Sequence, residues 1–129
     1  MSIHYKVIKK VTRTSPPQEK YYAFTKIKSD INLDQIAQRL SDGSTTRRAD
    51  VYAVLIGMVD LMKKELADGK RIRLGELGSF SVSLKSEGCD LPEQVSRHHI
   101  KGYKLQYRPS KALKKSFNSL EYKKAKTKP

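Results

Sequence analysis

The chain has 129 residues, a length typical of one domain, and its 37% apolar content allows only a thin core. Lysine and arginine number 27 against 13 aspartate and glutamate, which gives a net charge of +14 and favours a polyanionic partner. No stretch approaches the roughly 18 apolar residues of a membrane span, and the N-terminus lacks an apolar secretory signal. Cys89 is the single cysteine, so no internal disulfide can form. We therefore expect a cytoplasmic protein without membrane segments.

Two β-strands are predicted at the N-terminus. Residues 3–12 place apolar side chains on one face and His4, Lys6 and Lys10 on the other, although Ile8 and Lys9 break the alternation. Pro16 and Pro17 break the pattern before a second strand over residues 19–28. Residues 1–28 are therefore predicted to form a basic β-hairpin extension.

Two helices are predicted next. Asn32 is a suitable N-cap for a short helix with an apolar stripe, and Gly43 is expected to end that helix in a left-handed turn. The residues 44–46, Ser-Thr-Thr, offer caps for a longer helix through Asp68, with Gly69 as its stop. The apolar surface of the long helix is wider than one stripe, which indicates burial on two sides by a partner subunit or by a covering sheet.

A three-stranded antiparallel sheet is predicted after Gly69. Residues 71–74 form a short strand, Gly75 and Gly78 bracket a turn, and the next strand alternates apolar residues with serines. Residues 86–99 have no periodicity and are interpreted as a loop or arm, before an alternating strand over residues 100–107.

A terminal helix is predicted after Pro109, with Ser110 as its cap and Leu113, Phe117 and Leu120 at helical spacing. Residues 122–129 are too polar and charged to pack, and they are predicted to be a disordered basic tail.

The positive charge is concentrated in parts of the chain. Residues 1–28 carry seven basic residues against one acidic, a net +6, and residues 110–129 carry seven against one, also +6. Residues 70–109 carry eight against four, a net +4, whereas the helical region 29–69 carries five against seven, a net −2. Such a division indicates a basic binding surface along the presumed strands and both ends of the chain.

The order of a short helix, a long helix, a three-stranded sheet with a β-arm and a C-terminal helix is an α+β arrangement that resembles the bacterial histone-like HU/IHF family. Two segments carry the resemblance: GKRIRLGELGSF at residues 69–80, similar to that family's strand–turn–strand, and YRPSKALK at residues 107–114, similar to its closing segment. The likeness covers about residues 30–120, so residues 29–121 are predicted to be an HU-like DNA-binding domain. The N-terminal hairpin resembles the extension of a longer histone-like branch.

The resemblance implies an intertwined homodimer whose β-arms embrace the minor groove of DNA. In that family a Gly-Arg-Asn-Pro-like arm tip places a proline wedge between base steps. This chain departs from that pattern, because its one proline in the arm region is Pro92, between Leu91 and Glu93 and close to Asp90. Leu91 and Pro92 are the alternative candidates for an apolar wedge.

We therefore predict a histone-like, nucleoid-associated protein that binds double-stranded DNA with low sequence specificity, through backbone and minor-groove contacts, in the cytoplasm of a bacterium. Phosphate neutralisation by lysine and arginine is the expected mechanism. The candidate DNA-binding residues are the basic side chains of the sheet, the arm and the last helix: Lys85, Arg97, Lys101, Lys104, Arg108, Lys111, Lys114 and Lys115.

Two other interpretations remain open. One is an RNA-binding or ribosome-associated basic protein that stacks bases on its tyrosines, and the other is a structural module whose edge strand pairs with another protein. No catalytic constellation stands out, so we expect no enzyme activity, no cofactor and no small-molecule substrate. His98 and His99 with the distant Cys89 and His4 lack the spacing of a metal site, and no metal is expected.

Overall fold

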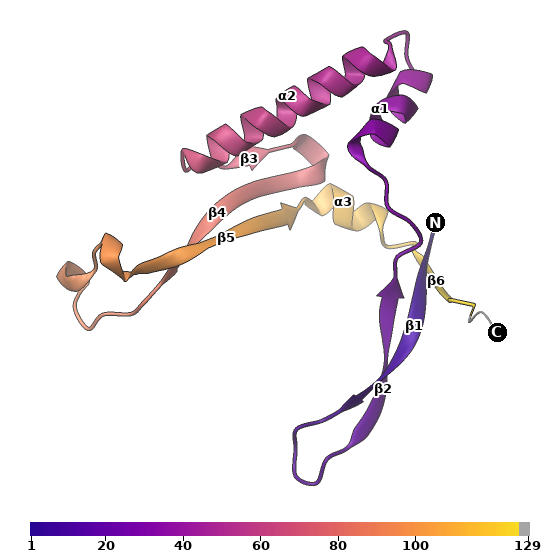
Figure 1. Cartoon of the computed structure of the whole chain (residues 1–129). Helices are drawn as coiled ribbons and strands as arrows, with labels where there is room; N and C mark the ends of the chain where they lie inside the picture. The colour runs from indigo at the N-terminus through magenta and orange to yellow at the C-terminus, as the bar shows by residue number, and fades with distance from the viewer. Residues whose placement is uncertain (127–129) are drawn as a thin grey trace. The chain divides into compact units, whose positions relative to one another are not determined.

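The structure is a computed structural model that describes residues 1–126. It has the mixed α+β class that the sequence predicts, and it divides into two compact units (Figure 1). The larger unit is Leu33–Ser116, and the smaller unit combines Met1–Asn32 with residues 117–126. The two ends of the chain therefore fold together, which the predicted boundaries at 1–28, 29–121 and 122–129 do not anticipate.

The larger unit contains a pair of helices, a sheet and a short final helix (Figure 1). These elements are α1 (Leu33–Asp42), α2 (Arg48–Ala67), β3 (Ile72–Arg73), β4 (Gly78–Ser86), β5 (Ile100–Pro109) and α3 (Lys111–Ser116). The sheet has the order β3-β4-β5 and is antiparallel throughout. β4 and β5 form a long ribbon with residues 87–99 at its far end, where two 3₁₀ turns, Pro92–Gln94 and Arg97–His99, lie.

Helix α2 begins and ends close to the predicted positions, but its start is built differently. Arg47 is the N-cap residue and provides no side-chain cap, so the hydroxyl caps expected from residues 44–46 are not used. Its end is the predicted one: Gly69 adopts a φ of +83°, and its N–H donates to the Leu66 carbonyl over 3.0 Å. Gly43 is not left-handed, unlike the expectation for the end of α1.

The apolar side chains of the larger unit are largely uncovered. Ala37 is the one buried hydrophobic residue of residues 1–126. On α2, Val54 is 71% exposed and Leu61 is 58% exposed, and on the sheet Leu84 and Leu105 are 63% and 71% exposed. Since covering each such side chain contributes about 1.5–3 kcal/mol when complete, this unit has apolar faces that another surface would stabilise.

The smaller unit is a three-stranded sheet built from both ends of the chain. Its strands are β1 (Ser2–Val11), β2 (Glu19–Lys26) and β6 (Glu121–Lys124), in the order β2-β1-β6. β1 and β2 form the predicted antiparallel hairpin, whereas β6 is parallel to β1.

The strand β6 replaces part of the predicted disordered tail. The Glu121 N–H donates to the Met1 carbonyl over 3.2 Å, and the Ala125 N–H donates to the Tyr5 carbonyl over 2.8 Å. Residues 122–124 form a strand because the edge of β1 offers backbone donors and acceptors to them. The composition of the tail alone could not reveal this pairing partner. Residues 127–129, the rest of the predicted tail, lie outside the described residues.

Helix α3 has the predicted cap but is shorter than predicted. The Leu113 N–H donates to Ser110 Oγ over 3.1 Å, the interaction expected of an N-cap serine. The helix ends at Ser116, and Phe117 and Leu120 belong to a turn closed by the Leu120 N–H and the Phe117 carbonyl at 3.2 Å.

Candidate nucleic-acid interface

The β3-β4-β5 sheet has one polar, basic face. Directly opposed residues of paired strands project to the same face, and alternate residues of one strand do so as well. The register pairs Arg73 with Ser79, Ser79 with Arg108 and Ser83 with Lys104. We call this surface the sheet polar face, and its side chains are Arg73, Ser79, Ser81, Ser83, Lys85, Lys104, Gln106 and Arg108.

The sheet polar face carries positive charge without local compensation. Strands β3, β4 and β5 contain no aspartate or glutamate. Arg73, Lys85, Lys104 and Arg108 are exposed, and none of them forms an ion pair with a carboxylate of residues 1–126. The serines between them offer hydroxyl donors, so the face presents groups that bind phosphate oxygens.

Arg73 is a candidate residue that the sequence analysis did not include. It lies in one row across three strands with Ser79 and Arg108, beside a hollow also lined by Gly75 and Ser110. Two guanidinium groups in such a row can donate hydrogen bonds to the oxygens of a phosphate group. The signal in the sequence was the alternation of Ile72 and Arg73, but a strand of two residues is too short to weigh by periodicity.

A set of hydrogen bonds fixes the base of the ribbon, where this row lies. The Tyr107 hydroxyl donates to the Leu77 carbonyl over 2.6 Å, and the Ser110 hydroxyl donates to the Glu76 carbonyl. Gly78 is buried there with a φ of +127°. The turn after β3 and the start of α3 are thereby tied together, which positions Arg73 and Arg108.

The predicted candidates do not all share the sheet polar face. Lys85, Lys104 and Arg108 do, whereas Lys101 lies at an irregularity of the β4–β5 pairing, since Lys85 opposes Gly102 and Ser86 opposes Ile100. This bulge removes Lys101 from the alternation. The last three candidates, Lys111, Lys114 and Lys115, are exposed residues of α3 rather than of the sheet.

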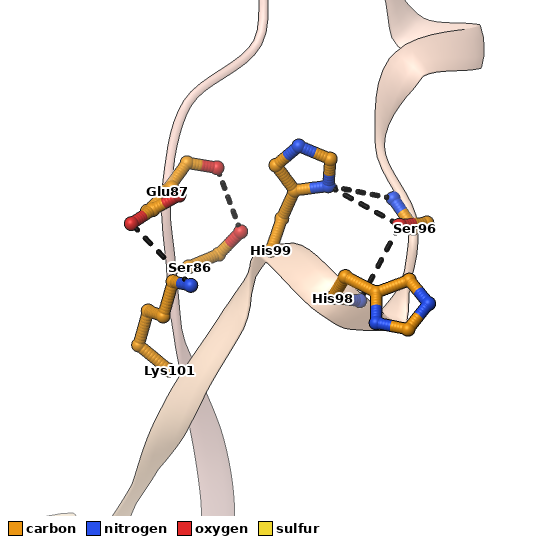
Figure 2. A network of polar contacts seen from close by, with 6 residues as sticks. All are labelled: Ser86, Glu87, Ser96, His98, His99 and Lys101. Carbon is orange, nitrogen blue, oxygen red and sulfur yellow. Dashed lines mark hydrogen bonds and ion pairs between the residues drawn. The ribbon is translucent and has the colours of Figure 1, made fainter.

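The far end of the ribbon is held by polar contacts (Figure 2). Lys101 Nζ lies 3.5 Å from Glu87 Oε1, and the Glu87 N–H donates to the His99 carbonyl over 2.9 Å. The Ser96 N–H donates to His99 Nδ1 over 3.1 Å, and Ser96 Oγ accepts from the His98 N–H over 3.3 Å. Lys101 is thus partly neutralised by Glu87, and Arg97 lies on an exposed 3₁₀ turn next to this network.

The wedge candidate Leu91 is accessible, since it is 50% exposed at the start of the Pro92–Gln94 turn. Asp90 and Glu93 beside it are exposed as well. An approach of this segment to a phosphate backbone therefore brings like charges together.

The tyrosines of the sheet lie on the opposite face from its cations. Tyr103 and Tyr107 oppose Leu84 and Phe80, and the Phe80 and Tyr107 rings lie 5.0 Å apart. Tyr103 lines an apolar hollow with Leu66 of α2 and Leu105. This placement separates aromatic and basic groups, which a single-strand-binding surface would combine.

Two other kinds of site receive no support from the residues described. Within residues 1–126, no three His, Cys, Asp or Glu side chains are grouped to hold a metal ion. In the same part of the chain, no helix has both the length and the apolar character that a bilayer crossing requires.

The fold and the basic sheet define an HU-like domain, in which paired helices precede a strand–turn–strand and a ribbon. The chain belongs to the HU-HIG family, described as an HU domain fused to wHTH, Ig, or Glycine-rich motif, which it matches over residues 1–124. The match includes the N-terminal hairpin and β6, so the smaller unit is part of the family pattern.

A solved structure supports the same fold. The chain is similar to a protein from Bacteroides vulgatus described as a "putative bacterial DNA binding protein", with a TM-score of 0.62 and 11% sequence identity. The alignment covers 99% of this chain and 50% of that chain, so this chain spans about half the length of that relative. No curated protein matches the sequence.

Proposed function

We propose that this protein binds double-stranded DNA through the sheet polar face. The observation that carries the proposal is a strand surface with four exposed, unpaired cations and no carboxylate in the strands that form it. Membership of a family with an HU domain and likeness to a described DNA-binding protein support the same partner.

The binding mode that we propose is backbone neutralisation with low sequence specificity. Lysine and arginine contacts to phosphate fix position on the duplex without distinguishing bases. The ribbon would place Lys85 and Lys104 along the DNA backbone and carry residues 87–99 toward the minor groove. A histone-like role in a bacterial nucleoid, without catalysis, follows from such a mode.

We also propose that the active form is a homodimer. Four apolar side chains are 58–71% exposed in the single subunit: Val54 and Leu61 of α2, and Leu84 and Leu105 of the opposite sheet face. Covering about two thirds of four such side chains would contribute on the order of 4–8 kcal/mol for each subunit. A second copy supplies a surface of the same kind.

The test is the salt dependence of DNA affinity for the double variant Lys85→Gln, Lys104→Gln. Each lost phosphate contact lowers the slope of log K against log salt concentration by about 0.9, so the slope should fall by about 1.8 for each bound subunit, or about 3.6 for a dimer. The matched control is Lys9→Gln, Lys70→Gln, which removes the same charge from lysines already paired with Glu19 at 3.0 Å and Glu65 at 2.6 Å.

Binding should weaken to the same degree for duplexes of unrelated sequence, and competition with duplex RNA and single strands should favour duplex DNA. An unchanged slope in the Lys85 and Lys104 variant, with the control also unchanged, would remove the sheet polar face as the binding site. Preference for single strands would favour the RNA-binding alternative.

A further inference from the structure

The β2-β1-β6 sheet of the smaller unit also has two chemically different faces. The register pairs His4 with Lys26 and with Lys123, Lys6 with Phe24, and Lys10 with Lys20. We call this surface the extension basic face, and its basic side chains are His4, Lys6, Lys10, Lys20, Lys26 and Lys123. Ile8, Tyr22 and Phe24 lie between them on the same face. The opposite face carries mainly apolar side chains, Ile3, Tyr5, Val7, Val11, Ala23 and Tyr122, together with Lys9, Glu19 and Lys124.

The row Lys123–His4–Lys26 lies at one end of this face. It crosses all three strands and brings together side chains from both ends of the chain. A hollow beside it is lined by Ile27 and Ala125 and by basic residues, without any carboxylate: His4, Lys26, Lys28, Lys123, Lys124 and Lys126. Positive groups gathered in this way repel one another, and an anion in their midst would relieve that repulsion.

The lysines of the extension basic face have no acidic partners in the described part of the chain. The ion pair of this unit, between Lys9 and Glu19 at 3.0 Å, lies on the opposite face, because Lys9 opposes Tyr21 and Glu19 opposes Val11. Lys10 Nζ lies 4.7 Å from the centroid of the Phe24 ring, so its contact is with an aromatic face rather than a carboxylate. The charge therefore remains available to a ligand.

The extent of the face suits a duplex. His4 and Lys10 are six residues apart on β1, which at about 3.3 Å per residue gives a cationic stripe of roughly 20 Å. At one charge per about 1.7 Å of duplex axis, this length meets many phosphates.

We infer that the extension basic face is a second binding surface for the DNA backbone, built where the two ends of the chain meet. The inference rests on the proposed function for the identity of its ligand, but not on the sheet polar face as a site. It assigns a role to β6, because Lys123 completes the row only when β6 pairs with β1.

The experiment compares variants of the full chain by the slope of log K against log salt concentration on one duplex. Lys26→Gln, Lys123→Gln removes two members of the row that crosses all three strands, and the slope should fall by about 1.8 for each bound subunit, or about 3.6 for a dimer. Lys6→Gln, Lys10→Gln removes two lysines of the same face that lie outside the pairing with β6, and it should also lower the slope. A lower slope in this variant cannot result from a loss of β6 pairing. The control is again Lys9→Gln, Lys70→Gln, in which the slope should stay at the wild-type value.

Combination with Lys85→Gln, Lys104→Gln separates the two proposals. If both surfaces bind, the losses in slope add to about 3.6 for each bound subunit. If both extension variants have the same slope as the control, the inference is overturned. A lower slope in the Lys85 and Lys104 variant of the same series would still uphold the proposed function. Loss in the extension variants alone would uphold the second surface and overturn the first.

Discussion

Gly78 is the residue whose substitution the structure restricts most. A Cβ added there would lie 2.2 Å from the Arg108 carbonyl oxygen and 2.9 Å from Pro109 Cα. Both are backbone atoms, so no rotamer change can move them. The residue also has φ +127° and ψ −154°, a region that is essentially limited to glycine.

The cost of Gly78→Ala follows from these two effects. The backbone conformation costs about 1–3 kcal/mol for a residue with a side chain, and forced displacement of packed neighbours costs about 1–3 kcal/mol more. The sum, about 2–6 kcal/mol, is a large part of the roughly 5–15 kcal/mol that stabilises a typical domain. We expect the urea midpoint to fall by about 2 M for a loss of about 4 kcal/mol and a slope of about 2 kcal/mol/M.

The assay is urea unfolding at one fixed protein concentration, because association contributes to apparent stability. Gly88→Ala is the matched control, since a Cβ at Gly88 meets nothing within 4 Å and its φ is not in the restricted region. Equal midpoints for the two variants would refute the close approach of β4 to the end of β5, and with it the placement of Ser79 beside Arg108.

Three further outcomes are expected. Ser110→Ala removes the oxygen that accepts from the Leu113 N–H and should lower the free energy of unfolding by about 0.5–2 kcal/mol in urea titrations, whereas Ser110→Thr should retain most of it. Leu105→Asp places a charge on the 71% exposed apolar sheet face and should halve the mass in sedimentation, whereas Gln106→Glu on the other face should not. The hydrogen bond to Glu65, and then the charge of Glu65, raise the pKa of Lys70, so its stabilising contribution is complete below the ordinary lysine pKa and is lost as pH rises through the raised value. Lys70→Gln should therefore show a shallower loss of stability above about pH 10 than the wild type in pH-dependent unfolding.

Features that depend on neighbouring residues could be predicted from the sequence. The two-residue period of residues 79–85 and 103–107 assigns side chains to faces without knowledge of a partner, and the register agrees. Ser110 caps its helix and Gly69 ends α2 because both effects are contained within one turn of chain.

Features that depend on distant residues could not be predicted. β6 has no apolar alternation, and its order comes from hydrogen bonds to β1, more than 100 positions away in the sequence. The displacement of Lys101 from the sheet polar face depends on a bulge that only the pairing with Ser86 creates. The basic row of the smaller unit was missed for the same reason, since Lys123 joins it through β6.

The proposed dimerisation and the proposed DNA binding would use opposite faces of the same ribbon. Because alternate side chains of a strand project to opposite faces, the surface that covers Leu84 and Leu105 must leave Lys85 and Lys104 facing away from it. A second subunit on the apolar face would therefore fix the ribbon without obstructing its cations. Salt acts on the two faces in opposite senses, since screening weakens phosphate contacts whereas apolar association does not depend on charge. In the proposed dimer, the same strands would hold the two subunits together under conditions that release the DNA.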